Sequence, residues 1–177
     1  MAILFADIRG STMLGERLGP AEYASALNRF YAAATEVLIR RDALVDKLIG
    51  DEVMALFIPG ICGPDYRRKA AEAALALMGA VGYGRGREPW MPIGVAVNSG
   101  MTYVGNVGSE GVVDFTALGD AVNTASRLAA SAAAGEILLG ADVYEALAGK
   151  YSGAEERTLN LRGKEVPFPV HVLRAGQ

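Results

Sequence analysis

The sequence predicts a mixed α+β fold, an α/β sandwich of the ferredoxin-like or palm type. The expected elements follow the order strand–helix–strand–strand–helix–strand, which is the split βαβ pattern, with additional strands at the C-terminal end. The segment LVDKLIGDEVMALF (44–57) contains two apolar runs that meet at a Gly-Asp turn, as in a β-hairpin. This pattern gives a βαββαβ core with an antiparallel sheet and helices on one face. The other face is then expected to meet either a second layer or a second chain. No internal repeat or long linker divides the 177 residues, so one domain covering 1–177 is expected.

The first half of the chain supplies the core elements in order. MAILFADI is a short buried strand, and the turn-forming residues RGST follow it. A helix is expected from about Pro20 to Arg41, because proline suits a first helical position and apolar residues then recur at helical spacing. After the hairpin, PGICGPD is expected to be a loop and YRRKAAEAALALMGAVGY an alanine-rich helix packed closely on the sheet.

The second half begins with GYGRGREPWMP, a loop rich in Gly, Arg and Pro that is expected to be mobile. PIGVAVNSG and MTYVGNVG are expected to pair as a hairpin that turns near Ser99 and Gly100. VVDFTALG then leads into the helix DAVNTASRLAASA, with Asp120 placed to cap it. EILLG is expected to be a strand, ADVYEALAG a short helix, and RTLNLRGKEVPFPVHVL a terminal hairpin.

Composition narrows the class of protein. The net charge of −3 and the pI of about 5.2 argue against non-specific binding to nucleic acid or to an anionic membrane. The single cysteine, Cys62, rules out an internal disulfide and fits a reducing compartment. No apolar run reaches the roughly 18 residues of a membrane span, and MAILFADIR lacks the basic start of a signal peptide. We therefore expect a cytoplasmic domain. Because Ile3, Leu4 and Phe5 already look like a strand, we also expect either an excised catalytic module or one whose upstream regulatory domains are missing.

Two aspartates are candidate metal ligands. Asp7 ends the first strand, and Gly10, Ser11 and Thr12 follow it, where glycine permits close backbone approach and helix-start amides can hold phosphate. Alone, this pattern also fits a turn or capping aspartate. Asp51 lies at the hairpin tip, which neighbours the end of the first strand in a βαββ sheet. Two adjacent carboxylates repel each other unless a cation lies between them, and Mg²⁺ is typically held by one or two carboxylates plus substrate phosphates.

A third candidate feature lies on the helix DAVNTASR. Asn123 and Arg127 are four residues apart and therefore share one helix face. An amide and a guanidinium on one face suit a sugar-phosphate, although an ordinary polar helix face remains an alternative.

Together, the motifs FADIRGST, KLIGDEVMALF and FTALGDAVNTASR resemble the catalytic domain of class III nucleotidyl cyclases, the adenylyl and guanylyl cyclases. The resemblance runs from the first strand to LNLRGKEVPFPVHVL. It implies conversion of ATP to cyclic AMP and pyrophosphate, with the following roles: Asp7, Asp51 and the Ile8 carbonyl bind two Mg²⁺ or Mn²⁺ ions; Lys47 and Thr116 read the purine; Asn123 orients the ribose; Arg127 stabilises the α-phosphate; Arg162 meets the terminal phosphates.

The resemblance also implies a head-to-tail homodimer with active sites shared between chains, so that Lys47 and Asp51 of one hairpin serve different sites. Lys47 can donate to adenine N1 and the Thr116 oxygen can accept from N6, which favours ATP and places the chain in a Thr-type subgroup. One departure is notable. Many family members carry an arginine just before the position of Asp114, where this chain has Val112 and Val113.

Two other functions are considered. A diguanylate cyclase shares the palm layout, but IGDEV resembles its hairpin motif only superficially and the NTASR helix has no counterpart there. A catalytically silent, cyclase-like module that binds nucleotide or partners is the second. A P-loop NTPase is excluded because the sequence lacks G-x-x-x-x-G-K-[ST].

Overall fold

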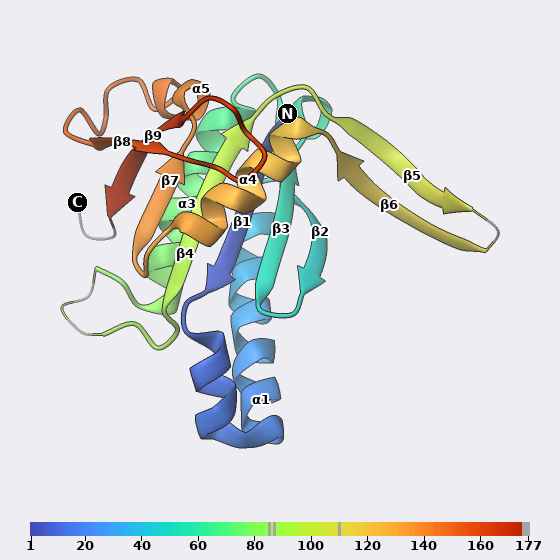
Figure 1. The fold of residues 1–177 in the computed structure, drawn as a ribbon, viewed down its shortest axis with the longest axis vertical. Coiled ribbons are helices and arrows are strands. Elements are labelled where there is room, and N and C mark those ends of the chain that lie inside the picture. The colour runs from blue at the N-terminus through green and yellow to red at the C-terminus, as the bar shows by residue number, and fades with distance from the viewer. Residues whose placement is uncertain (85, 87, 110, 175–177) are drawn as a thin grey trace.

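The computed structural model describes residues 1–84, 86, 88–109 and 111–174. The elements along the chain are β1 (Ala2–Ile8), α1 (Ser11–Ile39), β2 (Leu44–Ile49), β3 (Glu52–Phe57), α2 (Pro59–Cys62), α3 (Tyr66–Val81), β4 (Ile93–Ser99), β5 (Tyr103–Ser109), β6 (Val112–Leu118), α4 (Asp120–Ser131), β7 (Glu136–Leu139), α5 (Ala141–Glu145), β8 (Glu155–Leu159) and β9 (Phe168–Arg174). Figure 1 shows their arrangement.

The main sheet has seven strands in the order β2-β3-β1-β4-β7-β9-β8. All neighbours are antiparallel except β4 and β7, which run parallel. The order β2-β3-β1-β4 is that of a split βαβ unit, and the strands β7 to β9 extend it at one edge. The predicted α+β class with a mostly antiparallel sheet is therefore confirmed.

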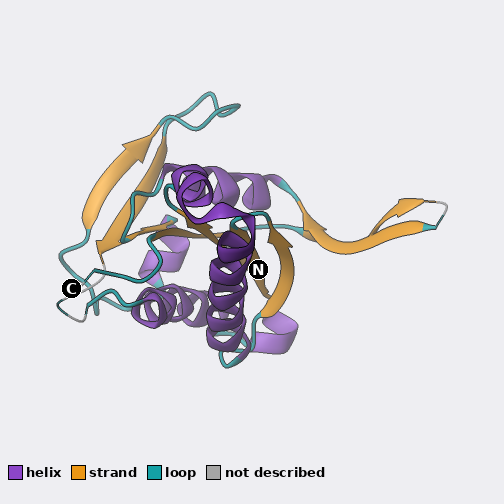
Figure 2. Ribbon diagram, turned by 90° about the horizontal axis from the view of Figure 1, so that it is seen from below, coloured by secondary structure: helices purple, strands orange, loops and turns teal. Residues whose placement is uncertain are grey.

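Side chains of β1 alternate between two hydrophobic cores. Leu4 and Ala6 pack in the core formed with α1 and α3, whereas Ile3 and Phe5 pack in a second core formed with α4. Of the two covers expected for the opposite face, the structure has a second layer, because α4 buries an alanine-rich stripe there. Figure 2 shows the sheet between helices on its two sides. The side chain of Asp7, two residues after Phe5, belongs to the α4 face.

The predicted hairpin between PIGVAVNSG and MTYVGNVG is wrong. β4 lies inside the main sheet between β1 and β7, and β5 pairs instead with β6, from Tyr103 opposite Leu118 to Ser109 opposite Val112. At the end of β4 the chain passes close to α4, since a Cβ added to Gly100 would lie 2.8 Å from the Cβ of Ala121. The chain then leaves the sheet, and β5 and β6 form an arm that projects from the body (Figure 1).

The first long helix starts earlier than predicted. α1 begins at Ser11, within the segment expected to be a turn, and Gly10 supplies the turn with φ 72°. Gly19, with φ 65° and ψ 165°, interrupts the helix, and Pro20 begins the second part. The predicted helix from Pro20 therefore matches only this second part. The Gly19-Pro20 pair reads as a helix start, so the helical turns from Ser11 to Leu18 were not predicted.

Two smaller predictions also need correction. The PGICGPD segment contains the short helix α2 rather than only a loop. Asp120 does not cap α4: Gly119 holds the N-cap position, and the Asp120 carboxylate instead accepts a hydrogen bond from Lys164 at 2.5 Å.

The loop at GYGRGREPWMP contains Arg85 and Arg87, which lie outside the described residues, so its predicted mobility is not addressed. Trp90 closes the loop by packing: its Nε1 donates to the Ala80 carbonyl at 3.0 Å, and the Arg29 guanidinium lies 4.0 Å from its ring centroid. None of the helices in the described ranges is long and apolar enough to cross a membrane.

Candidate active site

The end of β1 and the β2–β3 turn bring the two candidate metal ligands together. Asp7 pairs in register with Glu52, the residue after Asp51. The Asp51 main-chain carbonyl accepts a hydrogen bond from the Ile8 amide at 3.2 Å. Burial raises the pKa of Asp7, the positive charge of Arg9 opposes that rise, and the negative charge of Asp51 adds to it. The two carboxylates thus lie close enough to repel each other, as the sequence predicted.

Arg9 is already paired with the Asp7 carboxylate. The Arg9 guanidinium forms an ion pair with Asp7 and also donates to the Ala130 carbonyl at 3.2 Å. Burial, followed by the charges of Asp7 and Asp51, raises the pKa of Glu52 to about 7. This acidic centre is therefore one that a cation stabilises.

The donor set fits a divalent ion. In the described part of the chain, no three His, Cys, Asp or Glu side chains are grouped to hold one metal. Asp7 and Asp51 would be the acidic ligands, because their carboxylates act on each other, and main-chain oxygens such as that of Ile8, water and phosphate would complete the shell. Mg²⁺ is commonly bound in this way, through one or two carboxylates plus substrate phosphates.

A hollow beside the carboxylates suits phosphate. Ser11, Thr12 and Asp51 line a cavity of about 270 Å³ at the start of α1. Gly10 turns the chain into this helix, and the first-turn amides of a helix have no partners within it. The predicted phosphate-binding residues and Asp51 therefore meet at one place, where an anion would lie beside the metal ligands.

A separate cavity of about 420 Å³ contains three of the predicted nucleotide-binding residues. Lys47, Thr116 and Asn123 line it from β2, β6 and α4, and Glu52 joins them. The rest of its wall is mainly apolar: Phe5, Ile49, Met54, Val107, Ala117, Leu118 and Val122. An apolar slot with a few polar groups suits a planar base that stacks on its walls and is oriented by hydrogen bonds.

Asp46 connects the polar groups of this cavity. The β2–β3 register shifts between Val45 and Lys47, so Asp46 occupies a β-bulge. The Thr116 hydroxyl donates to Asp46 Oδ2 at 2.8 Å, and Lys47 Nζ lies 3.7 Å from the same oxygen. Lys47 also forms an ion pair with Asp114.

The sequence analysis gave neither Asp46 nor Asp114 a role. Strict alternation along a strand would put Asp46 and Lys47 on opposite faces, and only the bulge lets both reach Thr116 and its surroundings. No signal in the sequence marks that bulge.

The remaining predicted residues lie at α4 and the turn before β9. Asn123 is exposed, and Arg127 is half-buried one turn further along α4. A Cβ added to Gly163 would lie 3.5 Å from Arg127 Nη1 and Nη2, so the LRGK turn rests against this guanidinium. Arg162, the exposed residue before Gly163, therefore lies in the same region as Arg127.

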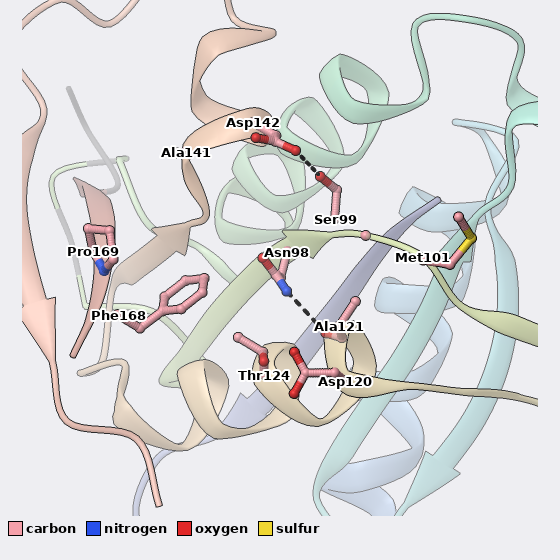
Figure 3. A pocket seen from close by; sticks show the side chains of 11 residues that line it. Asn98, Ser99, Met101, Asp120, Ala121, Thr124, Ala141, Asp142, Phe168 and Pro169 are labelled. Carbon is pink, nitrogen blue, oxygen red and sulfur yellow. Dashed lines mark hydrogen bonds between the residues drawn. The ribbon is translucent and has the colours of Figure 1, made fainter. Parts of the chain in front are cut away.

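Another cavity, of about 460 Å³, lies on the other flank of α4 (Figure 3). Asn98 donates to the Ala121 carbonyl at 3.1 Å and Ser99 donates to Asp142 at 3.4 Å, which ties the end of β4 to α4 and α5. None of the site residues predicted from the sequence lines this cavity. It is therefore separate from the cavity that holds Lys47, Thr116 and Asn123.

Comparison with known proteins identifies relatives of the whole fold. The family model described as "Adenylate and Guanylate cyclase catalytic domain" matches residues 1–174. A protein named adenylate cyclase from Anabaena cylindrica is 34% identical over 137 residues, which are 72% of this chain and 26% of that protein. The chain therefore spans about a quarter of the length of this relative.

Solved structures agree with that match. The guanylyl cyclase Cya2 superposes with a TM-score of 0.86 at 26% identity, covering 99% of this chain and 92% of that one. The adenylyl cyclase CyaB from P. aeruginosa superposes with a TM-score of 0.83, also at 26% identity, covering 98% and 93%. The two relatives differ in the base that their names specify, so likeness alone does not decide between ATP and GTP.

Proposed function

The chain belongs to the adenylate and guanylate cyclase catalytic domain family, and we propose that it converts ATP to 3′,5′-cyclic AMP and pyrophosphate. One observation supports this most strongly. The cavity that holds Lys47, Thr116 and Asn123 also contains Glu52, which pairs in register with Asp7 and so adjoins the two-carboxylate centre. One chain thus carries both halves of such a site, a base-sized slot and a place suited to cations and phosphates, and a head-to-tail partner would bring each slot opposite the other chain's carboxylates.

The choice of ATP rests on Lys47 and Thr116. Lys47 can donate to adenine N1, and the Thr116 oxygen can accept from the N6 amino group. Guanine presents an acceptor at O6 and a donor at N1, so this pair suits it less well. We therefore assign adenine as the base and GTP as the weaker substrate.

The divalent ions, Mg²⁺ or Mn²⁺ and two for each site, would be held by Asp7, Asp51 and the Ile8 carbonyl. When bound, they lower the pKa of the attacking hydroxyl and neutralise charge on the triphosphate. In the reaction, the ribose 3′-oxygen bonds to the α-phosphorus while the bond from that phosphorus to the β-phosphate oxygen breaks. The 3′-hydroxyl proton passes to solvent, and pyrophosphate leaves.

The protein residues position the substrate and stabilise developing charge. Asn123 orients the ribose, and Arg127 meets the α-phosphate where negative charge grows in the transition state. Arg162 and the amides of Gly10, Ser11 and Thr12 hold the outer phosphates.

We further propose that activity requires a head-to-tail homodimer, in which one chain gives Asp7 and Asp51 while its partner gives the base pocket and Arg127. Large apolar side chains are exposed on the β2 tip and on the β5–β6 arm: Leu48, Ile49, Tyr103, Val113, Phe115 and Leu118. A second copy of the chain would cover them, since an exposed apolar patch of this kind marks an interaction surface. Regulatory domains upstream would complete the full-length protein.

The direct test is incubation with ATP or GTP and Mn²⁺, followed by identification of the nucleotide product. Cyclic AMP with pyrophosphate supports the proposal. An excess of cyclic GMP over cyclic AMP would overturn the assignment of adenine. A cyclic dinucleotide would favour a diguanylate cyclase, and the absence of any product would favour a catalytically silent module. The Asp7→Asn and Asp51→Asn variants provide the inactive controls, because each keeps the side-chain shape and removes its charge.

A further inference from the structure

We propose that Asp46 is a positioning residue that sets base selectivity, because it holds the Thr116 hydroxyl with its lone pairs rather than its proton facing the base cavity. This inference rests on the proposed function and adds the origin of its preference for a 6-amino purine. Asp46 itself does not contact the base.

The geometry around Asp46 fixes the direction of the hydrogen bond. Its side chain is 1% exposed, and Thr116 is 6% exposed, so water does not compete freely for either group. An ionised carboxylate has no proton to donate, and therefore the Thr116 hydroxyl must donate across the 2.8 Å separation. A hydroxyl has one proton and two lone pairs, so Thr116 keeps only acceptor capacity for a ligand.

That direction matters to the purine. The 6-amino group of adenine can donate to the Thr116 oxygen, whereas the 6-oxo group of hypoxanthine or guanine would place an acceptor against an acceptor. Leaving a buried acceptor unpaired costs about 1–3 kcal/mol, which corresponds to roughly five- to 150-fold in relative rate. The polarity of a single hydroxyl therefore contributes to the choice between the two kinds of base.

Asp46 also lies near Lys47, the other residue assigned to recognition of the base. Lys47 Nζ lies 3.7 Å from Asp46 Oδ2, the oxygen that accepts from Thr116, and forms an ion pair with Asp114 on the other side. The ammonium is thus held between two carboxylates, of which Asp46 is buried and Asp114 is exposed. Removal of Asp46 would free the Thr116 proton to rotate toward the cavity and loosen Lys47 at the same time.

The test compares ATP with inosine triphosphate in Asp46→Ala and Asp46→Asn. Inosine triphosphate has a 6-oxo group, which faces Thr116, and a proton on N1, which faces Lys47, where ATP has a 6-amino group and an N1 acceptor. We expect the ratio of kcat/KM for ATP to that for inosine triphosphate to fall about tenfold or more in Asp46→Ala. The fall should be smaller in Asp46→Asn, since the amide oxygen can still accept from Thr116. Asp65→Asn is the matched control, because it removes the charge of an exposed aspartate that pairs with Arg68 and does not line the base cavity; its ratio should stay near that of the wild type.

A double-mutant cycle of Asp46 and Thr116 distinguishes an effect of Asp46 through Thr116 from a general disturbance of the fold. If Asp46 acts through Thr116, adding Thr116→Val to Asp46→Ala should change the ratio little further, although Thr116→Val alone lowers it. Additive effects of the two substitutions on the ratio would contradict the proposal. So would a wild-type ratio in both Asp46 variants, with thermal unfolding used to verify that they are folded.

A binding measurement distinguishes this inference from the proposed reaction. 3′-Deoxy-ATP and 3′-deoxyinosine triphosphate lack the attacking hydroxyl, so their dissociation constants report recognition without catalysis. If the wild-type protein forms no cyclic nucleotide but prefers 3′-deoxy-ATP, and Asp46→Asn and Asp46→Ala weaken that preference, the inference holds while the reaction fails. If neither analogue is preferred by the wild-type protein, the inference is overturned.

Discussion

Arg9 forms an ion pair with Asp7, two residues before it, at the carboxylate assigned to a metal ion. The guanidinium thus offsets part of the negative charge of an acidic centre that also contains Asp51 and Glu52. An incoming divalent ion has to share Asp7 with this cation or displace it. The pair therefore has consequences for metal affinity and for the stability of the metal-free protein.

We expect Arg9→Gln to bind Mn²⁺ about three- to tenfold more tightly, because a repelling positive charge is removed from beside the ligands. The metal-free variant should unfold at a lower temperature, and Mn²⁺ should raise that temperature more than in the wild type. Calorimetric titration and thermal unfolding measure the two effects. Arg40→Gln, which alters an exposed pair with Glu36, is the control, and an unchanged Mn²⁺ affinity in Arg9→Gln would contradict the prediction.

Substitution of Arg127 should affect the chemical step. We expect Arg127→Ala to lower kcat by about 10²–10³ while KM changes little, since the guanidinium is assigned to charge that develops in the transition state. Steady-state kinetics with ATP measure both constants. Arg68→Ala removes a half-buried arginine of α3 that pairs with Asp65 and Glu72, and it should leave kcat unchanged. A rise in KM at constant kcat would instead assign Arg127 to ground-state binding.

The shared site predicts that two inactive chains restore activity when mixed. Asp51→Asn lacks the metal side and Arg127→Ala lacks the transition-state side, so a head-to-tail pair of the two retains one intact site. Equal mixing gives half mixed dimers with one working site out of two, which is about a quarter of wild-type activity per chain. Turnover well above the sum of the separate variants supports sharing, and simple additivity means that each chain carries a complete site.

The arm is expected to provide much of the dimer contact. Phe115 on β6 is 52% exposed, and we predict that Phe115→Asp shifts the protein toward the monomer and lowers activity in proportion. Sedimentation measures the shift. Val166→Asp is a comparison at a more exposed apolar residue outside the arm and the β2 tip; if it dissociates the dimer as much as Phe115→Asp does, the arm is not the principal contact.

The protein should become less stable in acid because Glu136 becomes protonated there. Hydrogen bonds from Arg157, helped by the Ala133 amide and Arg174, outweigh burial and lower the pKa of Glu136 from 4.5 to about 2. Because the folded-state pKa is depressed, this stabilisation is present above about pH 4.5 and is lost as the pH falls toward 2. The shift corresponds to about 3 kcal/mol at most.

We therefore expect Glu136→Gln to be less stable than the wild type by about 1–3 kcal/mol at pH 7, with the difference shrinking toward pH 2. Urea unfolding at several pH values measures it. Glu155→Gln, which alters an exposed acid bonded to the same two arginines, should cost less. A difference between Glu136→Gln and the wild type that does not depend on pH would contradict this account.

Much of the fold could be predicted because local patterns specify it. β1, the β2–β3 hairpin, α3 and the terminal hairpin follow from apolar runs, turn residues and helical spacing. The pairing of β4 could not be predicted in this way, because its partners β1 and β7 are distant in sequence and only burial on both faces distinguishes it from an edge strand.

The candidate site shows the same division. Asp7 and Asp51 meet as predicted, since a strand end and a hairpin tip are neighbours in this topology. Asp46 received no role because a β-bulge breaks the two-residue alternation on which strand predictions depend. The roles assigned to Asn123, Arg127 and Arg162 remain predictions for the kinetic experiments.

The β5–β6 arm stands outside the main sheet, and an isolated two-stranded hairpin has little stability of its own in water. Thr116 lies on this arm, where its hydrogen bond to Asp46 ties one point to the main sheet, and a neighbouring molecule would brace the rest of the arm. Dilution, which removes the neighbouring molecule, should therefore speed amide hydrogen exchange along 103–118 and reduce the selectivity between purines. Both effects should precede any unfolding of the main sheet.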